Sequence, residues 1–471
     1  MNETRIRILC VGVPCLALLI AAALSHGGAA VAKETPPNII IFMADDLGWK
    51  DVGYHGSEIK TPNLDRLAAA GVRLERFYVQ PVCSPTRASL MTGRYPIRQG
   101  LQVAVIWPWA TWGLPLEERT LPSALKDAGY TTAITGKWHL GAHAKEYLPR
   151  QRGFDHQYGH YLGAIDYFTH SRNGGLDWHR NGKALREEGY TTNLIGAEAA
   201  GIIDHHTKDK PLFLYVPFNA PHAPLQAPDE YIARYKEIED VKRRKFAAMV
   251  TCMDDAIGKV VAALDRQGMR ENTLILFSSD NGGPTRLGAN NGSLRGGKGT
   301  LYEGGVRVPA LAVWPGKLRP GTVEETMHIV DWYPTLLRIA GGTTRGGKPL
   351  DGVDVWPAIA EGKPSPRDEI LHNHEPSRAA VRKGEWKLIV HEAAKGAKKK
   401  KAKDRSEGRT VELFNVVADP DEKTNLAAEH PEHVTRLTKL IEGYAKAAIP
   451  PKGVPGGQPK GFKTPKVWGE F

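Results

Sequence analysis

Three apolar segments constrain the fold of this chain more than any other feature, because each has the length of a buried strand and leads into polar residues. They are residues 38–43, 211–216 and 273–278. Helix-like segments lie between them, such as residues 63–71, in which Leu64 and Leu67 stand three apart and Gly71 ends the pattern. Buried strands that alternate with helices are typical of a parallel sheet covered on both faces. We therefore predict an α/β fold.

Polar side chains follow each of these strands. Asp45 and Asp46 come after the first strand, His222 lies in a proline-rich loop after the second, and Asp280 and Asn281 come after the third. Because open α/β sheets bind ligands at the carboxyl ends of their strands, we expect these groups at one edge. Oxygen ligands prefer Ca²⁺ or Mg²⁺ to zinc, and the wider Ca²⁺ shell tolerates an irregular set. The pattern predicts one calcium site, although each pair alone could cap a helix or turn.

Several cationic residues lie in loops, and each could bind a tetrahedral dianion. They are Arg87, Lys137, His139, His222 and Lys298. Lys137 and His139 are two residues apart, so in an extended segment both side chains point to the same side. Glycines around Lys298 admit close approach of the backbone to an anion, although a solvated loop has a similar composition. We predict that the five residues gather around one anionic substrate.

The pattern of the sequence changes near residue 370. Residues 380–390 are typical of a hairpin that turns at Lys383-Gly384, residues 411–414 of a further strand, and residues 429–448 of a closing helix. We predict a catalytic domain at 33–370, a smaller C-terminal α+β domain with an antiparallel sheet at 371–449, and an extended tail rich in proline and glycine at 450–471.

The first 32 residues are typical of a secretory signal peptide. Arg5 and Arg7 precede an apolar run at 8–24, and Ala30-Val31-Ala32 offers a cleavage site of small residues. The alternative is an uncleaved anchor, but the run is marginal for a span that needs about 20 residues. We expect export to a bacterial periplasm or to the medium, with no stable membrane insertion after cleavage.

Charge and cysteine content constrain the partners and the folding less strongly. The net charge of +11 favours polyanions, nucleic acid and sulfated glycan alike. Much of that charge lies in the lysine-rich run at 395–403, which is typical of a solvated loop, so charge alone does not decide the function. Without the leader only Cys83 and Cys252 remain of four cysteines, so no disulfide framework is implied.

Cys83 opens the run Cys83-Ser84-Pro85-Thr86-Arg87, and Leu90, Thr92 and Gly93 follow it. This run resembles the sulfatase signature Cys-x-Pro-x-Arg-x-x-Leu-x-Thr-Gly. Other family features match in order at Asp45-Asp46, 136–139, Pro221-His222, 280–282, Lys298 and 419–426. Over nearly all of its mature length the chain resembles a formylglycine-dependent (type I) sulfatase of the alkaline phosphatase superfamily. Segments 98–102, 106–108, 152–155, 162–167 and 302–307 make it most similar to the arylsulfatase B group, the N-acetylgalactosamine 4-sulfatases.

The resemblance implies a fold, a modification and a metal. The fold is an alkaline-phosphatase-like, mostly parallel mixed sheet sandwiched by helices. A formylglycine-generating or anaerobic sulfatase-maturating enzyme would convert Cys83 to Cα-formylglycine (3-oxoalanine). One Ca²⁺ would bind Asp45, Asp46, Cys83, Asp280 and Asn281. The reaction would release inorganic sulfate from a sulfated carbohydrate, with N-acetylgalactosamine 4-sulfate as one candidate, or from an aryl sulfate. We expect no nucleic-acid partner.

The resemblance also implies residue roles. One hydroxyl of the hydrated aldehyde at position 83, acidified by the metal, Lys137 and Arg87, would attack sulfur and form a covalent sulfo-enzyme. His222 and Lys298 would bind the sulfate and assist departure of the alcohol, with Asp280 sharing proton duties. His139 would deprotonate the second hydroxyl, so that sulfate leaves.

Two further residues are candidates for substrate contact. They are Trp107, which with Trp109 and Trp112 could form a sugar platform or a packed loop, and Asp166. Two other functions stay open. One is phosphate ester hydrolysis on the same fold, whose usual two-zinc site needs a histidine-rich shell that these motifs lack. The other is non-catalytic polyanion binding with Cys83 unmodified.

Overall fold

A computed structural model describes residue 1 and residues 35–392, 409–453 and 457–471. The predicted signal peptide beyond Met1 and the lysine-rich run at 395–403 lie outside the described residues. Pro36–Phe471 form one compact unit. In the part of the chain that is described, no helix has both the length and the apolar character needed to cross a bilayer.

A mixed, mostly parallel sheet of ten strands forms the centre of the described fold. In spatial order its strands are β12 (Gly321–His328), β2 (Val72–Tyr78), β11 (Ala310–Val313), β10 (Thr273–Ser279), β1 (Asn38–Ala44), β9 (Leu212–Pro217), β3 (Thr131–Lys137), β4 (His156–His160), β7 (His179–Arg180) and β8 (Lys183–Ala184). The strands from β10 to β4 are parallel, while β11 and β7 run antiparallel to their neighbours. The predicted α/β class and strand character are confirmed.

Helices cover both faces of this sheet. The α-helices of the described chain are α1 (Pro62–Ala70), α2 (Cys83–Thr92), α3 (Leu121–Asp127), α4 (Thr191–Asp204), α5 (Asp229–Ile232), α6 (Val241–Arg266), α7 (Glu303–Val306), α8 (Trp332–Ile339), α9 (Trp356–Ala360) and α10 (Pro431–Lys446), of which α10 packs on the second sheet. Successive side chains of β1 alternate between two cores, as the pleat requires. Ile40 and Phe42 pack with α1, α4 and α6, whereas Ile39 and Ile41 pack with α2, α3 and α8.

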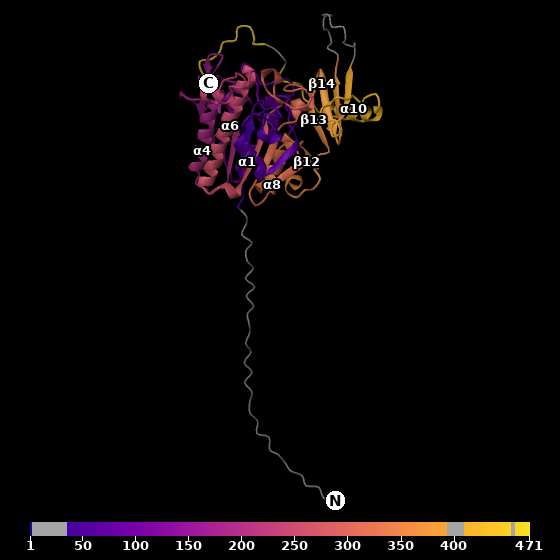
Figure 1. Cartoon of the computed structure of the whole chain (residues 1–471), viewed down its shortest axis with the longest axis horizontal. Helices are drawn as coiled ribbons and strands as arrows, with labels where there is room; N and C mark the ends of the chain where they lie inside the picture. Colours follow the sequence, from indigo (N-terminus) through magenta and orange to yellow (C-terminus); the bar gives the residue numbers. More distant parts are fainter. Residues whose placement is uncertain (2–34, 393–408, 454–456) are drawn as a thin grey trace. The chain divides into compact units, whose positions relative to one another are not determined.

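A second, antiparallel sheet holds β13 (Glu369–Glu375), β14 (Arg378–Lys383), β15 (Trp386–His391) and β16 (Thr410–Asn415) in that order. Leu437 and Ile441 of α10 pack against it. Figure 1 shows this sheet and α10 in orange to yellow on the opposite side of the large sheet from α4 and α6. The small antiparallel sheet is as predicted, and the exact domain limits stay a prediction.

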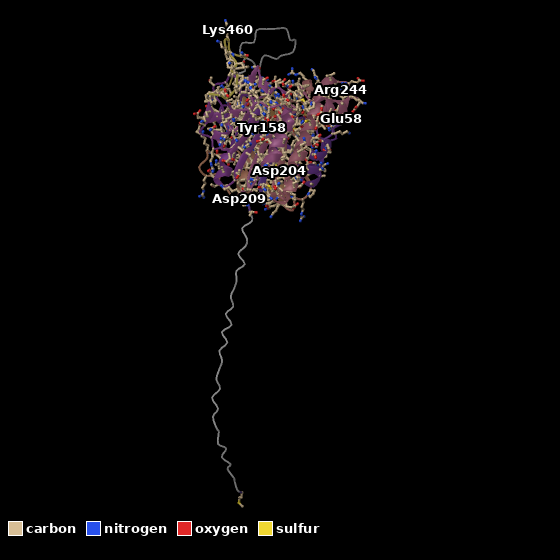
Figure 2. The ribbon with its side chains drawn as sticks, turned by 90° about the vertical axis from the view of Figure 1, so that its left-hand side faces the viewer. Glu58, Tyr158, Asp204, Asp209, Arg244 and Lys460 are labelled. Carbon is tan, nitrogen blue, oxygen red and sulfur yellow. The ribbon has the colours of Figure 1, made fainter. Side chains whose placement is uncertain are left out.

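The described part of the C-terminal tail packs on the rest of its unit. Val467 pairs with Leu176 of a two-stranded ribbon, β5 (Ser171–Arg172) and β6 (Gly175–Leu176), and Trp468 is buried. In Figure 2, Lys460 of the tail lies at the opposite end from Asp209, which precedes the amino end of β9. The tail therefore lies toward the carboxyl edge of the large sheet.

Candidate active site

The ends of the central strands are level, so the residues that follow them meet at one edge. Ala44 of β1 is in register with Ser279 of β10, and Met43 is in register with Pro217 of β9. Asp45, Asp46, Asp280 and Asn281 follow these ends and are all buried. Asp46 has a φ of 73°, and its N–H donates to Asp280 Oδ1 at 3.3 Å. The edge thus gathers three carboxylates, Asp45, Asp46 and Asp280, here called the carboxylate cluster.

Cys83 is the first residue of α2 and is buried beside the carboxylate cluster. Its thiol donates to Asp45 Oδ1 at 3.4 Å, and Lys298 Nζ lies 3.6 Å from its sulfur. Burial, together with Asp280 and Asp45, raises the pKa of the Cys83 thiol well above its usual range. The unmodified thiol is therefore protonated at neutral pH and a poor nucleophile.

The polar residues that follow Cys83 fix the entry into α2. The Thr86 hydroxyl donates to Gln80 O at 3.1 Å and accepts from Gln80 N at 3.0 Å. The Ser84 hydroxyl accepts from Ile106 N at 3.1 Å. The recognised signature thus also has a local structural role, because it holds both the turn before α2 and the loop that contains Trp107.

Each carboxylate of the cluster has a cationic partner. Arg87 donates to Asp280 Oδ2 through Nε at 3.0 Å and Nη2 at 2.8 Å. Lys137 at the end of β3 forms an ion pair with Asp45. Lys298 Nζ lies 2.6 Å from Asp46 Oδ1. Buried charges are tolerated when they are paired in this way.

Burial, neighbouring charges and hydrogen bonds together determine the pKa values of these groups. Burial raises the pKa of Asp46, but Lys298, His222 and hydrogen bonds outweigh it and lower the pKa to about 2. Burial raises the pKa of Asp280 to about 6, with Asp45 acting in the same direction. Burial and Lys298 lower the pKa of His222 to about 3. Asp46 is therefore ionised and His222 neutral at pH 7.

The edge of the sheet has the donors of a hard-cation site. Ligand atoms of Asp45, Asp46, Cys83 and His222 lie within 4.8 Å of one another. Asn281 donates to Asp46 Oδ1 at 2.8 Å, while its own side-chain oxygen is buried without a hydrogen-bond partner among the described residues. A buried acceptor without a donor is costly, and a cation beside it would satisfy it. The residues present therefore fit a metal ion held by oxygens.

His139 faces a cavity of about 310 Å³, which we call the Cys83 cavity. Residues that line it include Cys83, Ile106, Trp107, His139, Gly163, Arg172, His222 and Lys298. One ring nitrogen of His139 lies 3.0 Å from Ile106 O, and the other is buried without a partner among the described residues. Burial, Lys137 and Arg87 lower the pKa of His139 well below its usual range. The imidazole is neutral and can accept a proton.

The extended segment that we predicted to include both Lys137 and His139 is shorter than expected. β3 stops at Lys137, and His139 adopts a φ of 59° in the left-handed region. The alternation of a strand therefore does not position the His139 ring. The structure brings all five predicted cationic residues to the carboxyl edge, but not all of them from loops as predicted. Arg87 lies in α2 and Lys137 ends β3, whereas His139, His222 and Lys298 lie in loops.

The two candidates for substrate contact lie in different settings. Trp107 lines the Cys83 cavity and stacks on Trp109, with ring centroids 5.5 Å apart. The Asp166 carboxylate accepts from Phe168 N, Thr169 N and Gln226 Nε2, and it is not among the residues that line that cavity. Asp166 thus stabilises its own turn in the structure, and its predicted substrate role stays a prediction.

Sequence reasoning missed two residues of the cavity wall, Gly163 and Arg172. A Cβ at Gly163 would lie 2.4 Å from His139 Cε1, so only glycine leaves room for the ring. Arg172 enters the wall from the ribbon β5–β6. The turn signal Asn173-Gly174 predicts a ribbon there, but nothing local indicates that its arginine lines the Cys83 cavity.

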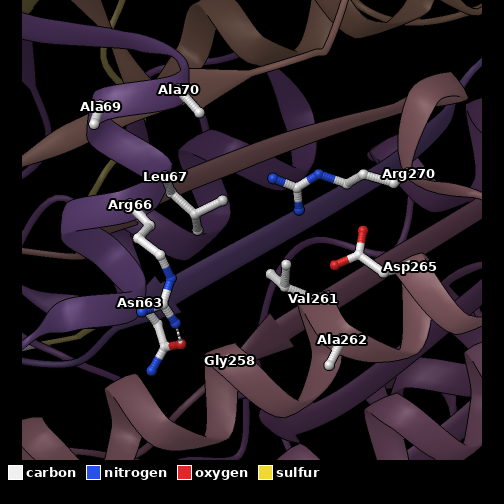
Figure 3. Close-up of a pocket in the computed structure, with 10 residues that line it drawn as sticks. All are labelled: Asn63, Arg66, Leu67, Ala69, Ala70, Gly258, Val261, Ala262, Asp265 and Arg270. Atoms are coloured by element: carbon white, nitrogen blue, oxygen red, sulfur yellow. Dashed lines mark hydrogen bonds between the residues drawn. The ribbon is translucent and has the colours of Figure 1, made fainter.

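A second cavity, of about 550 Å³, lies between α1 and α6 (Figure 3). Its lining includes Arg66, Leu67, Asp265 and Arg270. Arg270 precedes β10, whereas Asp280 follows its other end. This cavity is therefore at the opposite edge of the sheet and takes no part in the site at Cys83.

Comparisons with known proteins agree with this geometry. The family model described as Sulfatase matches residues 37–342. Arylsulfatase J of Mus musculus is 40% identical over 90% of this chain and 78% of its own. N-acetylgalactosamine-6-sulfatase of Mus musculus is 31% identical over 92% of this chain and 90% of its own. The solved structure of Ps i-CgsB in complex with k-i-k-neocarrahexaose is 34% identical, with a TM-score of 0.80, over 88% of this chain and 94% of that one.

The fold and the site define a hydrolase that acts on sulfate esters, and the chain belongs to the sulfatase family. It is a sulfuric ester hydrolase of the arylsulfatase and glycan sulfatase class, whose substrates are sulfated glycans or aryl sulfates. The predicted family is confirmed. This finding favours sulfatase chemistry over phosphate ester hydrolysis and over binding without catalysis.

Proposed function

We propose that the protein hydrolyses sulfate esters through a covalent sulfo-formylglycine intermediate at position 83, with one bound Ca²⁺. N-acetylgalactosamine 4-sulfate is the candidate substrate. The observation that supports this proposal is the placement of Cys83 at the start of α2, between the carboxylate cluster and Lys298. An anion at this position would meet cations and the positive end of a helix.

The oxygen-rich donor set supports calcium as the ion. Asp45, Asp46, Asp280 and Asn281 would hold it, together with the residue at position 83. When bound, the ion would acidify a hydroxyl and neutralise charge on sulfate oxygens. His222 lies 3.7 Å from Asp46 and so faces the same place.

The side chains around Cys83 can divide the reaction among them. Oxidation of the Cys83 thiol to an aldehyde, which adds water to give two hydroxyls on one carbon, would supply the nucleophile that the protonated thiol cannot. Lys137 and Arg87 stabilise negative charge beside the attacking oxygen, while His222 and Lys298 bind the sulfate and assist departure of the alcohol. His139, neutral and with a free ring nitrogen, accepts the proton whose removal releases sulfate.

The first test measures inorganic sulfate released by the matured protein. N-acetylgalactosamine 4-sulfate, its 6-sulfate isomer and 4-nitrophenyl sulfate are the substrates, Cys83→Ala is the blank, and peptide mass verifies the aldehyde. We expect selective 4-sulfate release that stops when EGTA removes calcium. Equal multiple-turnover rates for the matured enzyme and Cys83→Ser would contradict the aldehyde mechanism, because a serine ester cannot expel sulfate by that route.

Two features of cell biology belong to the same proposal. The aldehyde requires a formylglycine-generating or anaerobic sulfatase-maturating enzyme as a transient partner. The predicted leader directs export to the periplasm or the medium. Amino-terminal sequencing of the protein from a periplasmic fraction checks the predicted cleavage after Ala32.

A further inference from the structure

Arg172 differs from the other cations of the Cys83 cavity in having no anionic partner. It is half-buried, and its Nε is buried without a hydrogen-bond partner among the described residues. No carboxylate of the described chain lies within ion-pair distance of its guanidinium. Arg87, Lys137 and Lys298, by contrast, are each paired with a member of the carboxylate cluster. A guanidinium stays charged at any physiological pH, so Arg172 is an unmatched positive charge in the cavity wall.

The nearest source of negative charge does not neutralise Arg172. Asp177 affects it only through space, and the Asp177 oxygens already accept from Tyr161 N at 2.9 Å and Leu162 N at 2.8 Å. Partial burial of an unpaired charge costs free energy, which an anionic ligand in the cavity would recover.

The C-terminal tail holds Arg172 in this position. Trp468 Nε1 donates to Arg172 O at 2.9 Å, and the backbone of Leu176 bonds to both Lys466 and Trp468 at 2.9 Å. The tail thus bonds to both strands of the ribbon that carries Arg172, although Trp468 lies almost 300 residues from Arg172 in sequence. Such a constraint limits the entropy that the arginine loses on binding a ligand.

Aromatic rings connect the tail to Trp107, which also lines the cavity. Trp107 stacks on Trp109, Phe462 packs edge-on against Trp109 at 6.2 Å, and Phe462 stacks on Trp468 at 6.1 Å. Aromatic faces suit the apolar faces of sugar rings, and the guanidinium suits an anion on such a ring.

We propose that Arg172 binds a second anionic group of the substrate, separate from the sulfate that is cleaved. The ligand is a saccharide that presents a sulfate or carboxylate beyond the scissile ester. This inference rests on the proposed function, because it assigns a specificity residue to the same cavity. A sulfate and a carboxylate each offer paired oxygens to the guanidinium, and a comparison of substrates distinguishes the sulfate from the carboxylate.

The experiment compares substrates that differ only in the second anion. N-acetylgalactosamine 4-sulfate is compared with its 4,6-disulfate for the sulfate arm and with a uronate-containing 4-sulfated disaccharide for the carboxylate arm. We expect Arg172→Ala to lower the preference in kcat/KM for one doubly anionic substrate by about tenfold or more, which is the value of a charge-assisted contact. Arg172→Lys should retain part of that preference. Arg180→Ala is the matched control, because Arg180 pairs with Glu198 and does not line the cavity.

A binding experiment tests the inference even if the enzyme releases no sulfate. Isothermal titration of Cys83→Ala with the same saccharides, with and without Arg172→Ala, measures the preference without turnover. Loss of a preference in the double variant supports the inference. Preferences that are equal in the presence and absence of Arg172 overturn it, while sulfate release from 4-nitrophenyl sulfate shows separately whether the proposed function holds.

Discussion

Single side chains determine how charge is compensated at the carboxyl edge. Arg87 uses two nitrogens on Asp280 and a third, Nη1, on Lys137 O at 3.1 Å. It thereby links the end of β10 to the end of β3. A lysine keeps the charge but cannot reproduce this planar, forked contact.

We therefore expect Arg87→Lys to lower the catalytic rate strongly while the protein stays folded. We expect kcat/KM to fall about 100-fold, the usual effect of removing a fixed donor from a charge-stabilising site. Steady-state kinetics on a sulfate ester that the wild type hydrolyses provides the measurement, and thermal unfolding shows that the variant is folded. Arg180→Lys serves as the control on an exposed pair with Glu198. A change in kcat/KM of less than threefold would mean that charge alone suffices at position 87.

Gly163→Ala tests the packing that orients His139. The added Cβ would lie 2.4 Å from Cε1 and 2.5 Å from Nε2 of the ring, so the imidazole must shift, and the contact of Nε2 with Ile106 O is disturbed. We expect kcat to fall about 100-fold, because small displacements of a catalytic group have effects of that size. Gly201→Ala in α4 is the control, since its Cβ would have no atom within 4 Å. Unchanged turnover in Gly163→Ala would show that His139 has room to adjust.

Sequence patterns predict most of the charged residues of the site, but they do not predict the residues that complete the cavity wall. Asp45, Asp280 and His222 could be predicted because a buried strand, visible as an apolar run, precedes each of them. Arg172 and Gly163 could not, because their roles depend on the tail and on the His139 ring, which lie elsewhere in the chain. Local patterns encode which residues end a strand, and they do not encode which distant segment packs on a loop.

At the scale of elements, α6 stabilises the start of α1. The Asp254 carboxylate accepts from Leu64 N at 2.7 Å, and from Asn63 N at 3.0 Å and Asn63 Nδ2 at 2.7 Å. It thus satisfies backbone donors that the first turn of α1 leaves open. The same interhelix contact is buried, and this burial raises the pKa of Asp254 from 3.8 to about 6.

The pKa of Asp254 predicts a pH dependence of stability. The folded protein binds a proton at this group between about pH 4 and 6 that the unfolded chain has released, so the contribution of Asp254 to stability is greatest below that window. It is lost as pH rises through about 6, by up to about 3 kcal/mol. Asp254→Asn removes this titration. We expect urea unfolding at pH 4.5 and pH 7.5 to show a smaller fall in stability with rising pH for Asp254→Asn than for the wild type. Equal pH dependence of the two proteins would assign the effect to other groups.

The elements differ in how well sequence predicts them. β1, β9 and β10 are buried on both faces and read as continuous apolar runs, and α10 is amphipathic over most of the predicted 429–448. The edge strand β12 could not be read in this way, because most of it is exposed or half-buried, with no continuous apolar run, and it is held by pairing with β2. Its formation depends on a partner strand about 250 residues away, which periodicity cannot reveal.

At the scale of the whole unit, a buried network of charged and polar side chains joins the two sheets, because Glu303 of this network accepts from the Tyr78 hydroxyl of β2 at 2.8 Å. Lys387 of β15 donates to Glu303 at the start of α7 and forms an ion pair with Glu422 in the predicted 419–426 motif, both at 2.9 Å. Glu422 also accepts from Glu303 N at 2.6 Å. All three side chains are buried. Because Glu303 ends the loop that contains Lys298, the small sheet helps to position a residue of the Cys83 cavity.

Lys387→Met tests this connection between stability and catalysis. The variant leaves two buried carboxylates facing each other without their shared cation, so we expect a loss of about 3–5 kcal/mol in the free energy of unfolding. We also expect a higher KM, since Lys298 is proposed to bind the sulfate and its loop loses an anchor. Urea unfolding and steady-state kinetics measure the two effects.

Lys383→Met is the matched control, because Lys383 pairs with Asp368 and Glu369 at the surface and should contribute less than about 1 kcal/mol. If the two variants are equally stable, the network does not hold the sheets together. If Lys387→Met is unstable but binds substrate normally, the small sheet supports the fold without positioning Lys298.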